Sequence, residues 1–572
     1  MNKVIRSKDG VMICIYRRRA AQLLRWVAVC GASAIGLVGC TKAQYKAGAD
    51  REVYQVLDRK WKPEFGPQAN YRISDVETPS PTSAPAVVVP PSGTLTLADA
   101  VALATAKNRD YQTQKEDLYL AALALTLARH QFDPLFSGTL GGDAFRENEE
   151  KYITANGEFG FNLLLATGAQ ITTSIASDWL RFMTGEPRES LTSVLSGTIT
   201  QPLLRGGGSK VVLENLTQAE RNSLYQCRAF SRFRKTFVVS IITDYFRVLQ
   251  TLNSVGNARS NYESLKTSQQ RLEALAKAGR LPPFQVDQAQ QDVLRAEDTY
   301  VRAQEQYKQQ LDEFKIRLGL PATASIELDP NELAALEAKG VSAPEYGEDE
   351  AIETALAQRL DLANTRDQVD DAERKVGVAA NSLLADVNIV GSANVSAPER
   401  VRFGQIEFNH GKYDIGLDVN LPLDRKAERN AYRESLINVV RRQRDYDQAV
   451  DEVKLQVRQD YRDLRESSQL YRIQQTSLSL AKRRVESTEL LIQAGRADTR
   501  DLLEAQSALL QAQNATTAAL VSHSIARLNF FRDVEVLQVR TDGFWEISQA
   551  IKPIITSKDG ITPGSIQEPN KP

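Results

Sequence analysis

Two patterns of apolar residues alternate along this chain. In the first, which is unbroken by Pro from Val211 to Lys277, apolar side chains recur every three or four residues, as expected for one face of a helix. Its apolar positions there are Phe230, Phe233, Phe237, Ile241, Tyr245, Val248 and Leu252. The pattern returns in five further stretches: from Leu95 to just before Asp133–Pro134, over Phe284–Leu318, over Ala351–Ala380, from Tyr446 to Leu464, and over Leu502–Val536. The pattern predicts a mostly α-helical protein whose longest helix reaches roughly 100 Å if continuous.

In the second pattern, apolar and polar residues alternate one by one. It covers Phe136–Ala144, Leu195–Thr200, Val387–Val395 and Tyr413–Leu421, and residues 157–180 form a predicted hairpin around Ala166-Thr167-Gly168. Each predicted strand has one apolar and one polar face. In a soluble sandwich the apolar face would be core, whereas in a membrane barrel it would meet lipid. Asp414 and Asp418, on one polar face, favour a water-filled lumen.

An internal duplication organises the helices. Ala278–Gly279–Arg280 and Ala494–Gly495–Arg496 each interrupt a helical pattern, and they lie 216 positions apart (494 − 278). Asp244–Tyr245 and Asp460–Tyr461 show the same offset (460 − 244 = 216). Glycine takes the φ > 0 conformation that ends many helices. The sequence therefore predicts two similar helical hairpins with equivalent tips.

The N-terminal segment has the features of a secretory signal. Arg17–Arg19 precede a short apolar run, Trp26–Val38, that ends in Leu37-Val38-Gly39-Cys40. This ending resembles a bacterial lipobox, which makes Cys40 the expected lipidated residue. Thr41 follows it instead of the Asp that marks inner-membrane retention, which favours the outer membrane. Met12 is a candidate for the true initiator, and an N-terminal anchor helix is the alternative interpretation.

Composition narrows the possible functions. The chain has 572 residues with 71 Lys and Arg against 72 Asp and Glu, and this net charge of −1 argues against a nucleic-acid partner. Once Cys40 is modified, Cys227 remains as the ordinary cysteine of the mature chain, so no disulfide framework is expected. The three His are scattered and predict no metal site. Gly206–Lys210 lacks the spacing of a phosphate-binding loop and is interpreted as a flexible joint.

Taken together, the repeated order of helix, strands and long hairpin, the Ala-Gly-Arg tips and the Asp501-Leu-Leu-Glu-Ala-Gln506 motif resemble the TolC-like outer-membrane efflux proteins. The resemblance extends from about Leu95 to about Val539. It implies a homotrimer in which each copy adds four strands to one outer-membrane β-barrel and its long helices to a periplasmic α-helical barrel. The predicted hairpin at 157–180 exceeds that strand count.

The expected organisation has six parts. These are a lipoprotein signal peptide (1–39), a lipid-anchored extension with a Pro-rich linker (40–94), a first efflux repeat (95–321), an inter-repeat linker (322–350), a second repeat (351–540) and a disordered tail (541–572).

The resemblance implies a passive conduit and no enzyme, with no cofactor. A periplasmic membrane-fusion adaptor and a proton-driven or ATP-driven inner-membrane pump would be its partners, and outer-membrane lipid would surround the barrel. The tips, Ala278–Arg280 and Ala494–Arg496, are the expected adaptor-docking sites, although both could be simple helix caps.

By motif match, the family's acidic constriction falls on Asp501 and Glu504. They are three residues apart and share one side of a helix. The alternative is that they are ordinary carboxylates at a helix N-terminus. At two other family positions this chain has Gln285 and Ile492 instead of an acidic residue and a Tyr, so the family's detailed locking contacts are not carried over to this chain.

Two other classes remain open. One is a periplasmic coiled-coil adaptor or structural lipoprotein with a soluble β-domain. The other is a periplasmic lipoprotein enzyme, for which no nucleophile–base pair is visible.

Overall fold

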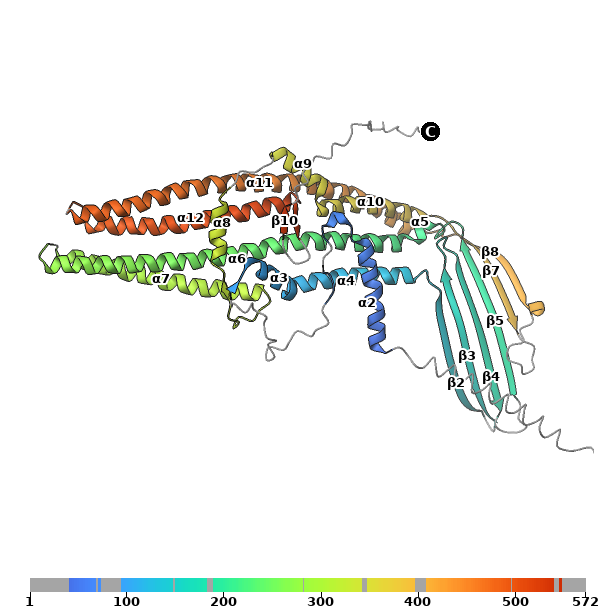
Figure 1. Ribbon diagram of the computed structural model, residues 1–572. Coiled ribbons are helices and arrows are strands. Elements are labelled where there is room, and N and C mark those ends of the chain that lie inside the picture. Colours follow the sequence, from blue (N-terminus) through green and yellow to red (C-terminus); the bar gives the residue numbers. More distant parts are fainter. Residues whose placement is uncertain are drawn as a thin grey trace, which may run out of the picture. The chain divides into compact units, whose positions relative to one another are not determined.

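The computed structural model describes residues 41–67, 70–73, 94–147, 150–182, 189–280, 282–341, 347–396, 408–494, 496–539 and 545–547. The chain divides into two compact units, residues 1–59 and 60–572. The described part of the first unit is helix α2 (Lys42–Lys60). The second unit holds the other elements: its sheet lies at one end and the tips of its long helical hairpins at the other (Figure 1).

Each repeat opens with a pair of helices. The pairs are α3 (Leu97–Lys107) with α4 (Arg109–His130), and α9 (Glu348–Gln358) with α10 (Leu360–Asn381). The sequence predicted one helix in each place, and the structure corrects this. Asn108 is extended and its side chain accepts a 2.9 Å hydrogen bond from the Tyr111 N–H, while its amide donates to the Arg317 carbonyl at 2.7 Å. Arg359 is likewise extended but makes no side-chain capping bond, so both breaks are turns between two helices and only the first is capped by a side chain.

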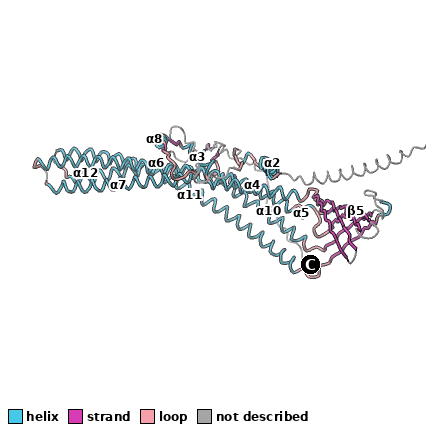
Figure 2. The backbone as a smooth tube through the Cα atoms, turned by 90° about the horizontal axis from the view of Figure 1, so that it is seen from below, coloured by secondary structure: helices cyan, strands magenta, loops and turns pink. Residues whose placement is uncertain are grey.

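The long helices form two hairpins. A short α5 (Ser209–Val212) leads into α6 (Glu214–Lys277), which packs along α7 (Pro283–Arg317), and α11 (Lys426–Gln493) packs along α12 (Thr499–Asp533). With 64 residues, α6 is about 95 Å long. The predicted apolar seam of α6 is confirmed, because Phe230, Ile241 and Tyr245 are at most 1% exposed. Helix α12 also packs along α6, and Figure 2 shows the long helices running together toward the tips.

Several small elements brace the middle of the second unit. Strand β1 (Thr94–Leu95) pairs in parallel with β6 (Glu327–Leu328), and β9 (Leu537–Val539) pairs with β10 (Trp545–Ile547). Helix α8 (Asn331–Lys339) and two 3₁₀ turns, η1 (Pro63–Phe65) and η2 (Phe408–His410), complete the described elements. The η1 segment packs on α6: Phe65 is buried, and its carbonyl accepts a 2.7 Å hydrogen bond from Ser231 Oγ.

Within the described residues, the sheet contains six antiparallel strands in the order β2-β3-β4-β5-β7-β8. Their bounds are β2 Leu135–Glu147, β3 Glu150–Leu164, β4 Gln170–Phe182, β5 Glu189–Pro202, β7 Asp386–Ser396 and β8 Lys412–Asn420. The predicted hairpin at 157–180 is confirmed as β3–β4, and it lies inside the sheet. The four strands per copy implied by the family resemblance are therefore wrong for this chain, because the first repeat adds four strands and the second adds two.

The register aligns one apolar face across all six strands. Ile199 lies opposite Ile171 on one side and Gly391 on the other, and Gly391 lies opposite Ile415. The same face carries Phe136, Leu140, Phe159, Leu195, Leu417 and Val419. The opposite face carries Ser, Thr, Asn and acidic residues such as Thr198, Asn394 and Asp418. The predicted alternation of apolar and polar faces is thus confirmed.

Candidate functional site

The first hairpin tip closes through three backbone hydrogen bonds. Gly279 has φ +72°, and its N–H donates to the Ala276 carbonyl at 2.9 Å. The Arg280 N–H reaches back to the Leu275 carbonyl at 3.0 Å, and the Ala278 N–H to Ala274 at 3.1 Å. These bonds satisfy the last carbonyls of α6. They leave Ala278, Gly279 and Arg280 exposed, as a docking surface requires.

The second tip closes in the same way. The Arg496 N–H donates to the Leu491 carbonyl at 2.8 Å, five residues back as at Arg280, and the Ala494 N–H donates to Leu490 at 3.1 Å. Ala494 and Arg496 are exposed. Gly495 lies outside the described residues. The shared sequence of the two tips thus produces one shared backbone closure.

The beginnings of α7 and α12 differ. Helix α7 starts after Pro282, which offers no side-chain cap. Helix α12 starts with a capping box: the Asp498 side chain accepts from the Asp501 backbone, and the Asp498 N–H donates to Asp501 Oδ2 at 3.2 Å. A hydrogen bond of 3.2 Å from Thr499 Oγ1 to Gln285 Oε1 connects the two tips. Gln285 therefore bridges the two hairpins within one chain.

Asp501 and Glu504 lie on the outer side of α12. Both are exposed, whereas Leu502 and Leu503 between them are buried. Glu504 Oε1 forms a 2.9 Å ion pair with Arg484 of α11. The alternative interpretation of Asp501 as a helix-terminal carboxylate matches its capping bond, and that bond leaves its second oxygen available to solvent or an ion. Sequence reasoning did not find Arg484, because it lies 20 residues before Glu504 and no short motif joins the two.

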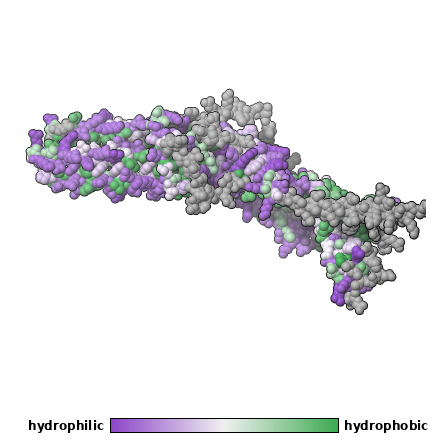
Figure 3. Space-filling view, turned by 60° about the horizontal axis from the view of Figure 1, so that its bottom comes forward, coloured by the Kyte–Doolittle hydropathy of each residue, from purple (hydrophilic) through white to green (hydrophobic). Residues whose placement is uncertain are grey.

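The exposed apolar face of the sheet is the second part of the site. Leu140 is 86% exposed and Ile415 is 89% exposed, and Phe136, Phe159 and Leu417 are also exposed. A contiguous apolar surface of this size across a six-stranded sheet marks a lipid or protein contact. By contrast, the helical part is mostly hydrophilic in the view of Figure 3, with scattered apolar residues. None of the described helices is long and apolar enough to cross a membrane.

A buried cluster of charges connects the repeats midway along the helices. Arg232 of α6 pairs with Glu535 at 2.9 Å, with Asp533 at 3.2 Å and with Asp361 at 3.2 Å, and Lys235 pairs with Glu535 at 2.8 Å. Asp533 and Glu535 are at most 7% exposed. Because breaking a buried pair leaves an uncompensated charge, the cluster holds the base of the second hairpin against the first repeat.

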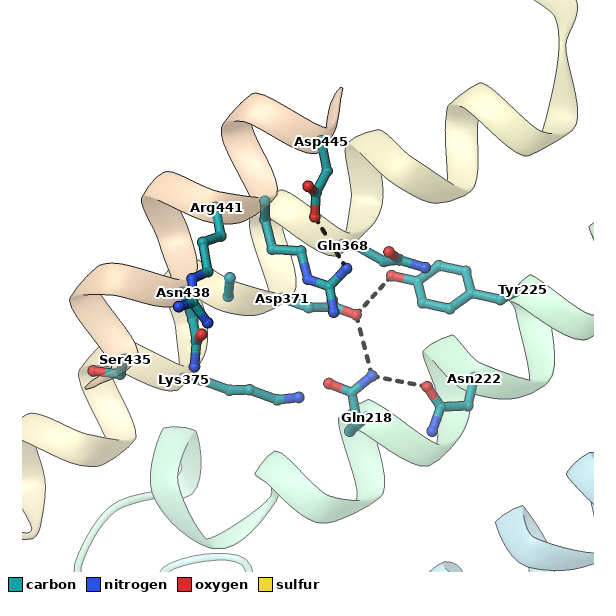
Figure 4. Close-up of a pocket in the computed structure, with 12 residues that line it drawn as sticks. Gln218, Asn222, Tyr225, Gln368, Asp371, Lys375, Ser435, Asn438, Arg441 and Asp445 are labelled. Atoms are coloured by element: carbon teal, nitrogen blue, oxygen red, sulfur yellow. Dashed lines mark hydrogen bonds and ion pairs between the residues drawn. The ribbon is translucent and has the colours of Figure 1, made fainter. Parts of the chain in front are cut away.

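A polar groove lies between α6, α10 and α11, with a cavity of about 500 Å³ (Figure 4). Tyr225 Oη donates to Asp371 Oδ2 at 2.6 Å, and Gln218 donates to the same oxygen at 3.1 Å. Burial and the bond to Asp371 raise the pKa of Tyr225 to about 12. Among the described residues, no group of His, Cys, Asp or Glu is arranged to hold a metal ion. None of the predicted site residues lines this groove, and we assign it no ligand.

Of the two cysteines expected in the mature chain, the structure describes one. Cys40 lies outside the described residues, so its lipidation stays a prediction. Cys227 is fully buried on α6, and burial raises the pKa of its thiol to about 11. A thiol in this state is unreactive.

The comparisons with known proteins give one match to a family model and several matches to solved structures. The sequence model of the family described as "Outer membrane efflux protein" matches residues 351–530. No curated protein matches the sequence. Among solved structures, the Campylobacter jejuni CmeC outer membrane channel has a TM-score of 0.56 at 14% identity, covering 84% of this chain and 95% of the other.

Two further channels show the same likeness. VceC of Vibrio cholerae has a TM-score of 0.55 at 14% identity, covering 77% of this chain and 95% of the other. The open state of the Neisseria gonorrhoeae MtrE outer membrane channel has a TM-score of 0.56 at 12% identity, covering 77% and 88%. At these identities, the likeness shows a shared fold.

Proposed function

We propose that this chain, a TolC-like outer-membrane efflux protein by the family match over residues 351–530 and by its fold, is the outer-membrane channel of a tripartite efflux or type I secretion system. It is a passive duct through which an inner-membrane pump moves its substrates. The observation that carries the proposal is the exposed apolar face of the sheet, continued by two long hairpins with equivalent tips.

A closed barrel is the natural state of this sheet in lipid. Only helices and closed barrels satisfy all backbone hydrogen bonds within a membrane. A sheet of six strands has too few strands to close alone, since membrane barrels begin at eight. Several copies must therefore share one barrel, and the proposed assembly is a homotrimer. The apolar face would then meet outer-membrane lipid, and the polar face would line the lumen.

The far ends of the hairpins suit a docking role. Arg280 and Arg496 are exposed at tips that close through the same backbone bonds, and each guanidinium offers donors to carbonyl or carboxylate groups. A periplasmic membrane-fusion adaptor is the proposed partner at both tips, and it would bridge to an inner-membrane pump. The lipobox at Cys40 supports a lipid anchor at the inner leaflet of the outer membrane.

Asp501 and Glu504 are proposed to form the periplasmic constriction. In a trimer they would supply two stacked rings, each with three carboxylates. Because both side chains are exposed on α12, they can face a water-filled pore without disturbing the packed seam. Arg484 partly offsets the charge of Glu504, so Asp501 would dominate the field at the mouth.

The test is reconstitution of the purified full-length chain. Detergent-solubilised protein is imaged by electron microscopy and then inserted into planar bilayers. Long trimers that produce ion currents are the expected result. A compact monomer that makes no currents would refute the channel and leave the structural lipoprotein or the enzyme as the answer.

A further inference from the structure

We infer that three copies of this chain close an eighteen-stranded barrel, in which β8 of one copy pairs with β2 of the next and Lys412 lies opposite Asp143. The inference rests on the proposed trimeric channel and adds its strand number, its seam and its register. It starts from the six strands that each copy contributes.

The β3–β4 hairpin is an integral part of the wall. Its turn at residues 165–169 is held against the loop that connects β5 to α5: the Gly208 N–H donates to the Thr167 carbonyl at 3.1 Å, and Thr167 Oγ1 donates to Gln201 at 3.2 Å. Gly168 has φ +94°, and a Cβ there would lie 2.8 Å from the Gly206 carbonyl. The turn at 165–169 thus packs closely against the loop after β5, which argues that the β3–β4 hairpin stays within the sheet.

The lateral contacts of β3 and β4 support the same conclusion. β3 and β4 pair along 13 positions, from Tyr152–Phe182 to Leu164–Gln170. Ser174 and Ser196 hydrogen-bond at 2.8 Å across β4 and β5, and Ser177 and Ser193 do so at 3.0 Å. The apolar face continues across β3 and β4 through Phe159 and Ile175. Both strands are therefore paired on both sides, like the other interior strands β5 and β7.

The two edges of the sheet are complementary in direction. β2 runs away from the helices and β8 runs back toward them, so β8 and the next copy's β2 are antiparallel, like each neighbouring pair within the sheet. Both edge strands expose their apolar side chains on the same face. An unpaired strand edge in lipid would leave its N–H and C=O groups without partners. A second copy of this chain is the occupant that continues both patterns.

The stagger of the strands fixes the register. Leu135 is the first residue of β2. The residue paired with it on β3 has its own partner on β4, and this series of directly paired residues continues across the sheet to Asp414 of β8. Asp414 lies six residues before Asn420, where β8 ends (420 − 414 = 6). If the helix-proximal ends of β8 and the next β2 are level, each copy contributes a stagger of six residues. Six residues rise about 20 Å and six strands span about 29 Å, so the strands tilt by about 35°, as barrels require.

This register places Asn420 opposite Leu135 and Lys412 opposite Asp143. The lysine and the aspartate lie on the polar face and form a charge pair across the seam. On the apolar face, Ile415 lies opposite Leu140. A shift of two residues in one direction places Asp414 opposite Asp143, which like charges disfavour. The opposite shift leaves Lys412 beside Gly141 and lowers the tilt to about 25°.

The consequence is a wide duct. Barrel diameter grows roughly in proportion to strand number, so eighteen strands make a barrel about 1.5 times as wide as twelve. Polar side chains of all six strands would line it. The barrel would then not limit the size of the cargo, and the narrow point would lie at the hairpin tips.

Engineered disulfides test the seam in the full-length chain. The pair Asp143→Cys with Lys412→Cys should, on oxidation, give covalent dimers and trimers in denaturing gels, because these positions lie on opposite edges of one copy and can react only between copies. The matched controls are off register by two residues: Asp143→Cys with Asp414→Cys, and Gly141→Cys with Lys412→Cys. We expect at least fivefold less cross-linked product from each control.

The possible outcomes separate the inference from the proposed function. Cross-links only in the controls would overturn the register. Native trimers that conduct ions but cross-link in none of the pairs would overturn closure through β2 and β8, while the channel stands. Protein that forms neither trimers nor pores would refute the proposed function itself.

An independent measurement needs no variant. A cryo-electron microscopy map of the wild-type trimer in lipid nanodiscs should show eighteen strands, and a ring of twelve strands would refute the inference. A deletion then isolates the hairpin. Phe161 of β3 and Gly197 of β5 both pair with Thr173 of β4, so they occupy the same level of the sheet. They are 36 positions apart in the sequence (197 − 161 = 36). Deleting residues 150–185 therefore joins β2 to β5 with both faces preserved. The barrel should shrink by about one third in diameter.

Discussion

At the base of the first hairpin, the ring of Tyr245 lies 6.1 Å from that of Phe314, and at the base of the second, Tyr461 lies 6.1 Å from Phe530. Both pairs are related by the offset of 216 positions (461 − 245 and 530 − 314). The duplication has therefore kept not only the tips but also the aromatic contact that holds α6 to α7 and α11 to α12.

The charges beside these rings differ. Asp244 pairs with Arg317 at 3.0 Å in the first hairpin, and the two equivalent positions in the second are Asp460 and Asp533 (244 + 216 and 317 + 216). An exposed ion pair has become a buried pair of carboxylates. Arg532 and Arg232 compensate Asp533, and Arg232 belongs to the first repeat. The base of the first hairpin is thus locally balanced, whereas that of the second depends on its neighbour.

The tips differ in the same sense. The first has Pro282–Pro283 and the neutral Gln285, and the second has a capping box with Asp501 and then Glu504. Equal backbone closure at both tips is consistent with equal docking. Asp501 and Glu504, at positions where the first hairpin has Gln285 and Gln288, are consistent with a separate role in conduction. The comparison of the two hairpins can be tested both at their tips and at their bases.

The largest effect is expected at the glycines of the tips. Gly279→Val with Gly495→Val should abolish export while the trimer persists, because Gly279 has φ +72° and a β-branched residue there distorts the closure that presents Arg280. Among the described residues, no atom lies within 4 Å of a Cβ built at Gly279, so the described packing is not disturbed. Export is measured as drug or dye efflux in cells, and trimers by native electrophoresis.

The control is Gly256→Val, in the middle of α6, where the space is also open and φ is ordinary for a helix. It should export normally. Testing Gly279→Val and Gly495→Val singly sharpens the comparison, since equivalent tips should lose similar amounts of export. Normal export by a correctly assembled double variant would contradict a docking role for the tips.

The next effect concerns the acidic residues of the second hairpin. Asp501→Asn with Glu504→Gln should remove cation preference and block by divalent or trivalent ions applied from the periplasmic side, because six carboxylates at a narrow mouth attract and bind cations. Assembly should survive. The amide oxygen introduced by Asp501→Asn can still accept the capping bond, and the pair between Glu504 and Arg484 is exposed and contributes at most about 1 kcal/mol. Planar-bilayer recordings measure both properties.

Asp287→Asn on the first hairpin is the matched control, since this exposed carboxylate lies one turn into α7 and carries no motif match. It should leave selectivity and metal block unchanged. If the double variant and the wild type had the same cation preference, the constriction would have to lie elsewhere.

Much of the fold could be predicted because it follows from the local spacing of apolar and polar residues. The seam of α6, the alternation in β2 and β8, and the offset of the tips each follow from side-chain spacing, and the structure contains all three. The helix breaks at Asn108 and Arg359 could not be predicted, because neither position is Gly or Pro. The side chain of Asn108 caps the Tyr111 N–H locally and also contacts Arg317, a residue 209 positions away.

The role of the candidate site stays a prediction. Motif match pointed to Asp501 and Glu504, and the structure shows that both are exposed on α12. It could not find the bond from Thr499 to Gln285 or the ion pair with Arg484, because these depend on how helices distant in sequence are aligned. The strand number depends on hydrogen bonds between β4 and β5, which no local pattern specifies.

A moderate effect is expected at the base of the second hairpin. Burial and the neighbouring Asp533 raise the pKa of Asp460 to about 7. The unfolded value is about 3.9, so the folded protein holds this proton more tightly. The stability it contributes is fully present below about pH 4 and is lost as the pH rises through about 7. Asp460→Asn removes the titration, and it should stabilise the protein above pH 7 by about 1 to 2 kcal/mol after allowance for partial solvent access.

The measurement is the urea midpoint of the trimer, followed by circular dichroism at pH 5 and pH 8 and at one protein concentration. Wild type should lose stability between the two values, and the variant should lose less. Asp533→Asn gives the opposite sign: despite its burial, Arg532 and Arg232 lower the pKa of this carboxyl, so the variant should be destabilised at both values. A wild-type midpoint that rises from pH 5 to pH 8 to the same extent as that of Asp460→Asn would contradict the assignment.

The smallest effect is expected at the equivalent pair of the first hairpin. Arg317→Gln removes the 3.0 Å ion pair with Asp244, whose two side chains are 51% and 27% exposed. Exposed pairs of this kind contribute about 0.5 kcal/mol, and salt screens them, so the difference from wild type should shrink between low and high ionic strength. The Arg317 carbonyl still accepts from Asn108, because that bond uses the backbone. A loss as large as that of Asp533→Asn, or one unaffected by salt, would mean that the first base is as tightly coupled to its surroundings as the second, and the contrast between the two hairpins would fail.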